Sequence, residues 1–566
     1  MKKKLSILLL ILALLCSVLA GCTTTGQKTD NGTVGNTDNG TVKTGGDSTG
    51  EKKLADEQIF TFVGHNDMMT LDVSLMNDEM SALVMYAVNE ALIRYSKGKT
   101  VPGIAEKYEI SDDGTVYTFH LRDAKWSDGQ PVTAYDFEYA YLRLLNPETG
   151  SSQVEDFSSI LNAMAYANGE ITDASQVGIK AVDEKTLVIT LEKADPFFLE
   201  EMAQGINFYP IRKDYVEKYG ANYGSSPESF IGCGPFVLTE WLQGARIVME
   251  KNPEYWDADS IILEKVVEHI VTDENTRVGM YDLGQVDGIY SISAVQTVKY
   301  YDSFGSHAGG TLQHLVFMSK DGAVLSNKNL RLALSYAINR EAIVKAISSP
   351  GTEVAYSMID PSISLDGQSI IEKYPASTNV PAAGDPAKAK EYLNAALSEM
   401  GLSSPSELPE IKYVCLDSPT HRAYAEALQA QWEDVLGVKV SINIMPVPQA
   451  IGSLLAGEFD IFLNGMSTGV APETLLDNYT MDNRNNYAKW SNQEYTELYK
   501  ASMNANSLEE RFTKLQQAHQ LILDECPVAP LWLPGTAYLY KDYVDGIFYG
   551  RQTGSIEFIH AKILEH

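Results

Sequence analysis

The chain has 566 residues and a formal net charge of −31, because 75 acidic residues outnumber 44 basic ones. A protein this acidic is repelled by nucleic acid and by anionic membrane surfaces, so neither is expected as a partner. One hydrophobic core rarely serves a chain of this length, so we expect at least two domains or lobes.

Residues 1–21 predict a signal peptide. Lysines at positions 2–4 precede an uncharged apolar run over residues 5–20, which suits a signal-peptide core but is short for a membrane span. The run ends in Leu19-Ala20-Gly21-Cys22, which resembles the lipobox of bacterial lipoproteins. The resemblance implies cleavage before Cys22 and lipid attached to that residue. The alternative is an ordinary cleaved signal in which Cys22 is incidental.

The next segment predicts a tether. Residues 23–55 are mostly Thr, Gly, Asn, Asp and Lys, and the sequence Thr-Asp-Asn-Gly-Thr-Val occurs at both 29–34 and 37–42. Such a composition cannot bury enough apolar surface to offset the conformational entropy lost on folding. We therefore expect residues 22–55 to be a lipidated cysteine followed by a disordered tether.

From residue 56 onward the pattern is mixed α/β. Residues 116–121, 438–444 and 459–463 are predicted strands, and residues 330–347 place their apolar side chains roughly on one helical face. A further helix, predicted to end at Gly437, carries Tyr424, Leu428, Trp432 and Leu436 at a spacing of four. Helices alternating with strands predict layered sheets with covering helices.

Cysteines and histidines predict neither a disulfide framework nor a metal centre. Beyond Cys22 only Cys233, Cys415 and Cys526 remain, so at most one disulfide is possible and packing must hold the fold. The chain contains no H-x-x-x-H pair of histidines and no C-x-x-C pair of cysteines. We therefore expect no cofactor and no metal site.

Four sequence blocks occur in an order and at spacings typical of one family. They are Ala124-Lys125-Trp126-Ser127-Asp128-Gly129, Gly232-Cys233-Gly234-Pro235-Phe236, Ala333-Leu334-Ser335-Tyr336-Ala337-Ile338-Asn339-Arg340 and Gly457-Glu458-Phe459-Asp460-Ile461. With these blocks the chain resembles the extracytoplasmic solute-binding proteins that feed peptide ABC transporters, the oligopeptide-binding family. The resemblance covers essentially all of residues 56–566.

The resemblance implies an α/β fold, a two-lobe periplasmic-binding-protein-like clamp with an extra domain in the first lobe. Lobe I would combine residues 56–89, 206–310 and 531–566, the extra domain would be 90–205, and lobe II would be 311–530. Peptides would lie extended in the cleft and bond to the main chain of the protein as an added strand does.

The implied function is binding without catalysis. Lobe closure over a captured peptide would present it to the permease subunits of an ABC transporter. We expect a monomer, anchored by the lipid on Cys22 to the outer face of the cell membrane, or periplasmic if the host has two membranes. The first alternative keeps the clamp and changes the cargo to another solute or to a signalling peptide.

The resemblance also implies where the ligand binds. The ligand strand of lobe II would be Asn464, Gly465, Met466, Ser467, Thr468 and Gly469. His421 falls where the family has a histidine near the ligand's carboxyl end, although a surface histidine at a helix start is an equal reading. Main-chain contacts from the first lobe would fall near Asn77, Asp78 and Glu79.

The chain departs from the family at this strand. Well-studied relatives have an Arg, a Trp and an Asp where this chain has Leu463, Met466 and Gly469, and that Asp pairs with the α-ammonium group of the ligand. Glycine cannot form this ion pair. Another carboxylate must do so, or the ligand lacks a free amino terminus there; the candidate carboxylates are Glu473, Asp477 and Asp67.

Residues 465–469 also match the G-x-S-x-G pattern of a serine hydrolase, which is the remote alternative. Ser467 would be its nucleophile, with Asp524 and His560 as acid and base. The motif requires a helix directly after it, and Pro472 stands where the first turn of that helix would run. We therefore expect no catalytic residues.

Overall fold

The computed structural model describes residues 53–97, 99–300, 303–365, 367–505, 507–550, 556–557 and 559–566; the signal peptide and Cys22 lie outside them. Ordered structure begins before residue 56, since Leu54 forms a bridge with Leu564 and the Ala55 N–H donates to Ile563 O at 2.9 Å. The end of the expected tether is thus paired with the carboxyl end of the chain.

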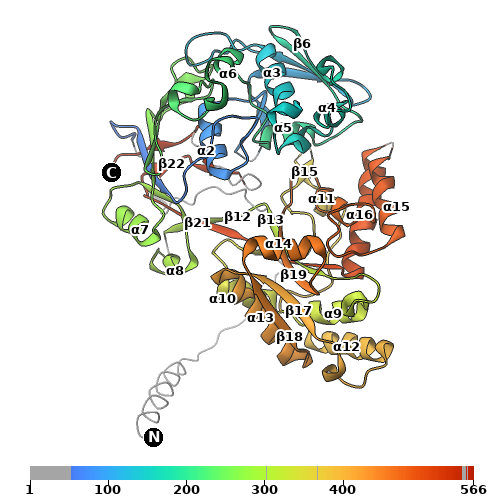
Figure 1. The fold of residues 1–566 in the computed structure, drawn as a ribbon. Helices are drawn as coiled ribbons and strands as arrows, with labels where there is room; N and C mark the ends of the chain where they lie inside the picture. Colours follow the sequence, from blue (N-terminus) through green and yellow to red (C-terminus); the bar gives the residue numbers. More distant parts are fainter. Residues whose placement is uncertain are drawn as a thin grey trace, which may run out of the picture. The chain divides into compact units, whose positions relative to one another are not determined.

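Two large mixed sheets organise the described residues into two lobes (Figure 1). In the first sheet the order of strands is β12 (Phe304–Ala308), β21 (Gly535–Tyr540), β11 (Gly288–Ile292), β1 (Ile59–Gly64), β10 (Lys265–Ile270), β9 (Arg246–Lys251) and β8 (Phe236–Leu242). In the second it is β14 (Glu353–Val354), β20 (Val528–Leu533), β13 (Thr311–Phe317), β19 (Ile461–Ser467), β17 (Ile411–Leu416) and β18 (Val440–Met445).

A smaller antiparallel sheet is formed within residues 105–190. Its order is β4 (Ala105–Ile110), β5 (Val116–Leu121), β7 (Thr186–Thr190) and β6 (Ile179–Asp183). Helix α3 (Ala134–Leu145) packs on β6 and β7, and its start is fixed by a capping box between Thr133 and Asp136. The short two-stranded ribbons are β2 (Ile93–Ser96) with β3 (Lys99–Pro102), β15 (Ser364–Leu365) with β16 (Gln368–Ser369), β22 (Val544–Asp545) with β25 (Lys562–Ile563), and β23 (Phe548–Tyr549) with β24 (Ile556–Glu557).

The two large sheets are joined by crossovers that run side by side. Gly309 and Gly310 connect β12 to β13, Pro534 connects β20 to β21, and the Gly309 N–H donates to Pro534 O at 2.8 Å. Antiparallel pairing of β12 with β21, and of β13 with β20, continues on both sides of these connections.

Helices cover the second sheet on both faces. Side chains of one face, including Leu315 and Leu463, pack with α9 (Lys328–Tyr336), α10 (Arg340–Ile347), α12 (Pro386–Met400) and α13 (Pro419–Leu436). Side chains of the other face, including Val316 and Phe462, pack with α14 (Val447–Ala456), α15 (Gln493–Met503) and α16 (Leu508–Glu525). The remaining helices are α2 (Glu79–Val88), α4 (Ala163–Ala167), α5 (Phe198–Gln204), α6 (Lys213–Tyr219), α7 (Glu274–Asp282), α8 (Ala294–Thr297) and α11 (Ile370–Lys373).

Most predicted elements are confirmed, with two corrections. The strand at 116–121 and the helix ending at Gly437, which takes a left-handed conformation (φ 66°), are as predicted. The single helix predicted over 330–347 is wrong: the Asn339 side chain accepts from the Ala342 N–H at 2.8 Å and starts a new helix, α10. The strand predicted at 459–463 begins at Ile461 and continues to Ser467.

Two further sequence features have an outcome among the described residues. Cys233, Cys415 and Cys526 are all buried free thiols. In the part of the chain that the structure describes, no helix combines the length and apolarity needed to cross a bilayer.

Arg340 is a buried hub of the second lobe, exposed by only 2 %. Its guanidinium donates to Ala355 O at 2.7 Å, Pro530 O at 3.1 Å and Pro381 O at 3.2 Å, and also to Val380 O. It therefore holds three segments that lie far apart along the chain against the start of α10.

We expect Arg340→Met to lower the free energy of unfolding by about 3 kcal/mol or more, since several buried carbonyl groups lose their donor at about 1–3 kcal/mol each. Arg422→Met is the matched control, because Arg422 is exposed and its ion pair with Asp417 contributes about 0–1 kcal/mol. Thermal melting followed by circular dichroism measures both. Equal melting temperatures for the two variants would contradict the assignment.

Candidate functional site

The candidate site is built on an unpaired edge of β19. On one side β19 pairs with β13 along its whole length, from Ile461 to Ser467. On the other side it pairs with β17 only at Ile461 and Phe462. Within the described residues no strand lies against this second edge from position 464 to 467, so a main chain from outside could pair there.

Strand alternation identifies which residues offer groups at this edge. The Thr468 N–H donates to Gly310 O at 2.8 Å, so Thr468 faces β13. Successive residues of an antiparallel strand direct their N–H and C=O groups to opposite sides. Gly465 and Ser467 therefore direct theirs to the unpaired edge, and both are exposed.

Asn464 and Met466 lie on the face of β19 that is covered by α14 and α16. Asn464 is 8 % exposed and is paired across the sheet with His314. His314 is fully buried, its Nε2 lies 2.9 Å from the Tyr479 hydroxyl, and burial lowers its pKa to about 4. A neutral imidazole is thus fixed beside the strand, while the Asn464 Nδ2 is buried without a hydrogen-bond partner among the described residues.

Gly469 has a backbone and surroundings that favour glycine. Its φ is 62°, and an added Cβ would lie 2.4 Å from Thr474 Oγ1. A side chain there would be strained by both the backbone and the contact. This explains in part why no carboxylate occupies the position.

The three candidate carboxylates each have a partner inside the protein. Glu473 is buried and forms an ion pair with Arg511. Asp67 accepts from the Trp241 indole N–H at 3.0 Å and from the Gly244 N–H at 2.6 Å. Asp477 accepts from Asn483 Nδ2 at 2.8 Å. The partners of Glu473 and Asp67 are remote along the chain, so the sequence did not show that these two carboxylates are already engaged.

His421 lies in the first turn of α13, which follows β17. Its N–H donates to Ser418 Oγ at 3.2 Å, and its Nδ1 lies 2.8 Å from the same oxygen. The ring is half-buried, and this burial lowers its pKa. Because Val414 of β17 is the partner of Phe462, the chain leaves β17 toward α13 close to the point where the unpaired edge of β19 begins.

The first-lobe candidates lie at the start of α2. The Asp78 side chain caps the helix by accepting from the Ser81 N–H at 2.9 Å, and Glu79 accepts from the Tyr290 hydroxyl. Asn77 Nδ2 donates to Ser152 Oγ at 3.4 Å. The Asp78 and Glu79 side chains thus bond to residues of α2 and β11, and Asn77 contacts Ser152.

The residues of the hydrolase alternative lie in separate surroundings. Ser467 Oγ accepts from the Gly469 N–H at 3.3 Å, Asp524 accepts from Gln520 Nε2 at 2.9 Å, and His560 Nε2 lies 3.3 Å from Ser96 Oγ. The chain after Gly469 forms turns before the short 3₁₀ helix Asp477–Tyr479 rather than the required helix. Among the described residues there is also no group of three His, Cys, Asp or Glu side chains that could hold a metal ion.

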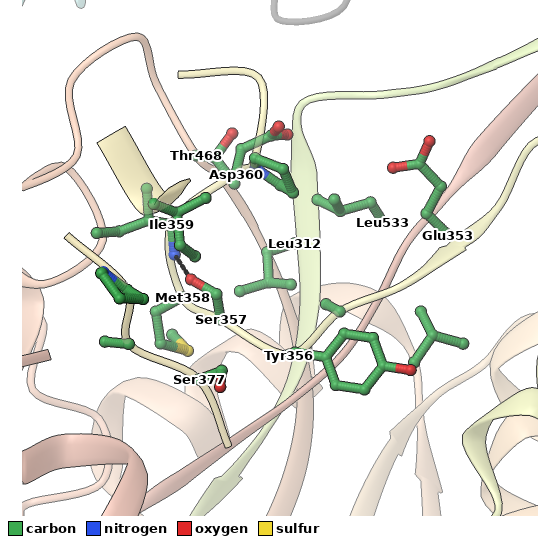
Figure 2. Close-up of a pocket in the computed structure, with 16 residues that line it drawn as sticks. Leu312, Glu353, Tyr356, Ser357, Met358, Ile359, Asp360, Ser377, Thr468 and Leu533 are labelled. Carbon is green, nitrogen blue, oxygen red and sulfur yellow. Dashed lines mark hydrogen bonds between the residues drawn. The ribbon is translucent and has the colours of Figure 1, made fainter. Parts of the chain in front are cut away.

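A pocket of about 240 Å³ opens next to Thr468 and the crossovers (Figure 2). We call it the crossover pocket and define it by the buried side chains Leu312, Ala355, Met358, Ile359, Thr468 and Leu533. Its outer wall is the segment 353–361, which sequence reasoning missed because it has neither helical nor strand periodicity.

His519 positions this wall from α16. It is fully buried, and its Nε2 accepts from the Met358 N–H at 3.1 Å and lies 3.3 Å from Ser357 Oγ. Ser357 Oγ accepts in turn from the Ile359 N–H at 2.9 Å, the bond drawn in Figure 2. Nε2 must carry a lone pair to accept, and burial lowers the pKa of His519 to about 3, which keeps it neutral.

The sequence of this chain is similar to one family of binding proteins. Residues 99–487 match the family described as bacterial extracellular solute-binding proteins, family 5 Middle. The chain is 29 % identical to the dipeptide-binding protein DppE of Bacillus subtilis, over 88 % of this chain and 90 % of that protein. It is also 29 % identical to the oligopeptide-binding protein OppA of the same organism, over 92 % and 95 %.

Among solved structures, the substrate-binding domain of an oligopeptide ABC transporter from Bacillus anthracis is similar, with a TM-score of 0.70 and 28 % identity. The alignment covers 91 % of this chain and all of that one (100 %). The two-lobe α/β fold is therefore shared over nearly the whole length.

The His519 assignment predicts a pH-dependent stability. Its folded pKa of about 3 lies below the unfolded value of about 6.5, so below pH 6.5 the unfolded chain binds a proton that the folded chain excludes. The stabilisation is complete above pH 6.5 and is lost as the pH falls, by about 2 kcal/mol at pH 5. We expect His519→Gln, which can still accept from Met358 but cannot titrate, to flatten the melting temperature between pH 7 and pH 5. His566→Gln, at an exposed position, serves as the control; a His519→Gln profile parallel to that of the wild type would refute the assignment.

Proposed function

Because the chain belongs to family 5 of the bacterial extracellular solute-binding proteins, we propose that it captures peptides between its lobes and delivers them to an ABC permease. Relatives of similar length are a dipeptide-binding and an oligopeptide-binding protein, and an oligopeptide ABC transporter supplies the similar structure. The chain acts as a receptor and not as an enzyme.

The observation that carries the proposal is the unpaired edge of β19 at Gly465 and Ser467. An extended peptide can add to such an edge through main-chain hydrogen bonds, which supply affinity without reading side chains. Gly465 has no side chain to obstruct an approaching backbone, and both residues are exposed.

The carboxyl end of the peptide binds at the start of α13. The positive end of the dipole of this 18-residue helix lies there and favours a carboxylate, while the His421 N–H is already bonded to the Ser418 cap. His421 lies in this first turn and adds a neutral ring that can hydrogen-bond. Of the positions considered for the amino end in the described part of lobe II, Glu473 is paired with Arg511, Asp477 accepts from Asn483, and Gly469 has no side chain.

Residues 1–21 act as a lipoprotein signal, and lipid on Cys22 tethers the protein to the outer face of the membrane. This proposal rests on the Leu19-Ala20-Gly21-Cys22 sequence alone. We expect Cys22→Ser to move the protein from the membrane fraction to the soluble fraction, because two or three acyl chains hold a protein and one polar residue does not. Fractionation followed by immunoblotting measures this. A membrane-bound Cys22→Ser protein would contradict the tether, and Cys16→Ser is the matched control.

Native mass spectrometry of the gently purified protein, followed by denaturation, tests the cargo directly. A released set of short peptides supports peptide capture. A released non-peptide solute keeps the clamp and overturns the cargo. Turnover of an ester substrate that Ser467→Ala abolishes would overturn the receptor in favour of a hydrolase.

Ser467→Pro tests the main-chain pairing. Proline removes the one N–H that Ser467 offers to the edge and leaves the β13 ladder intact, so we expect about tenfold weaker peptide binding, corresponding to about 1.4 kcal/mol. Ser467→Ala retains the N–H and is expected to bind as the wild type does. Isothermal titration calorimetry with a tripeptide measures both affinities. Equal loss in the two variants would assign the effect to the hydroxyl group and contradict main-chain pairing.

A further inference from the structure

The crossover pocket lies where the two lobes are joined. Leu312 stands at the beginning of β13, directly after the first crossover, and Leu533 stands at the end of β20, directly before the second. Thr468 follows Ser467, the last residue of the unpaired edge. The pocket is thus lined by residues close to both connections between the sheets and by Thr468 at the end of the proposed ligand strand.

Its walls are mainly hydrocarbon, although Glu353, Ser357, Asp360, Ser377 and Thr468 are also among the lining residues. Leu312, Met358 and Leu533 are each exposed by 3 % or less of their surface. Two of the polar side chains that line it, Asp360 and Thr468, are bonded within the protein. Asp360 accepts from the Ser362 N–H at 2.8 Å and from its hydroxyl at 2.7 Å, and the Thr468 hydroxyl donates to Gly310 O at 3.0 Å. Water in such a pocket is poorly held, since an ordered buried water requires two to four polar partners.

The volume of the crossover pocket limits the size of the group that can bind in it. Interiors of proteins contain few voids larger than a water molecule, so about 240 Å³ is not an ordinary packing defect. An apolar cavity of about 150 Å³ binds benzene, whereas sites that enclose a whole small ligand span about 300–1,000 Å³. The crossover pocket therefore fits one large side chain and not a complete peptide.

We propose that the crossover pocket receives one bulky apolar side chain of the ligand, either aromatic or branched aliphatic. The inference rests on the proposed function and specifies its substrate class: peptides that carry such a residue bind more tightly than peptides of small or charged residues. An apolar side chain displaces poorly held water, and Asp360 and Thr468 keep their partners within the protein.

The position of the wall gives the pocket its shape before any ligand arrives. The Arg340 guanidinium donates to the Ala355 carbonyl, and His519 accepts from the Met358 N–H. These bonds fix the main chain of Ala355 and Met358, which line the pocket together with Leu312 and Leu533. A preformed pocket spares the ligand the entropy of ordering its walls.

Titration calorimetry with a matched peptide series tests the proposal. The series is Ala-Ala-Ala and its variants with Phe, Leu or Asp at each position in turn. We expect at least one Phe or Leu peptide to bind ten times or more tightly than Ala-Ala-Ala. The peptide with Asp at that same position is expected to bind more weakly than Ala-Ala-Ala. Equal affinities across the series would overturn the inference while peptide capture stands. If no peptide binds, the proposed function fails and the inference falls with it.

A variant that fills the pocket locates the effect. Ala355→Leu places extra carbons in the pocket and is expected to reduce the Phe-to-Ala affinity ratio at least fivefold. Ala245→Leu makes the same change at an exposed site in the first lobe and is expected to keep the ratio. Met358→Ala enlarges the pocket and is expected to shift the preference toward Trp, which tests the site if Ala355→Leu does not fold. An unchanged ratio in folded Ala355→Leu protein, or an unchanged preference in Met358→Ala, would place the apolar subsite elsewhere.

Discussion

A main-chain segment that leaves its sheet must find other partners for its N–H and C=O groups, and the second lobe meets this requirement with buried side chains. After β14 the Ala355 N–H still donates to Leu531 O of β20 at 3.0 Å, but from Tyr356 to Met358 the chain has no neighbouring strand among the described residues. Arg340 donates to its carbonyl at Ala355, and His519 accepts from its N–H at Met358. Left unpaired, each such buried group would cost about 1–3 kcal/mol. The segment can therefore stand away from β13 and β20, and the space between them is the crossover pocket.

Part of β19 also lacks a neighbouring strand among the described residues. An exposed strand edge invites association with other chains, and proteins usually keep such edges short or covered. Here the open part is confined to positions 464–467, since β17 covers Ile461 and Phe462 and α13 begins at Pro419. An edge this short supports a peptide of a few residues but little aggregation. The chain leaves β17 after Leu416 and begins α13 at Pro419. The edge of β19 beyond Phe462 is therefore open, and the start of α13 lies near it.

Local signals allowed much of this fold to be predicted. Helix α13 was predictable because its apolar residues recur at a spacing of four and Gly437 ends it, and both signals lie within a short window. The break between α9 and α10 was missed, because the apolar pattern continues through Asn339 and only its cap shows a new start. Family resemblance indicated the strand at 464–469. The partners of Glu473 and Asp67 were not predictable, since Arg511 and Trp241 come from remote parts of the chain.

These partners decide how a ligand without a carboxylate anchor can bind tightly. To pair Glu473 with the ligand's ammonium group, its buried ion pair with Arg511 would have to break, at a cost of about 3–5 kcal/mol. Complete burial of a Phe or Leu side chain contributes about 1.5–3 kcal/mol, or about ten- to a hundredfold in affinity, and breaks nothing. Because the φ of 62° and the nearby Thr474 side chain favour glycine at position 469, apolar burial is the less costly source of affinity. In the proposed site, recognition of an apolar side chain therefore takes the place of recognition of a charge.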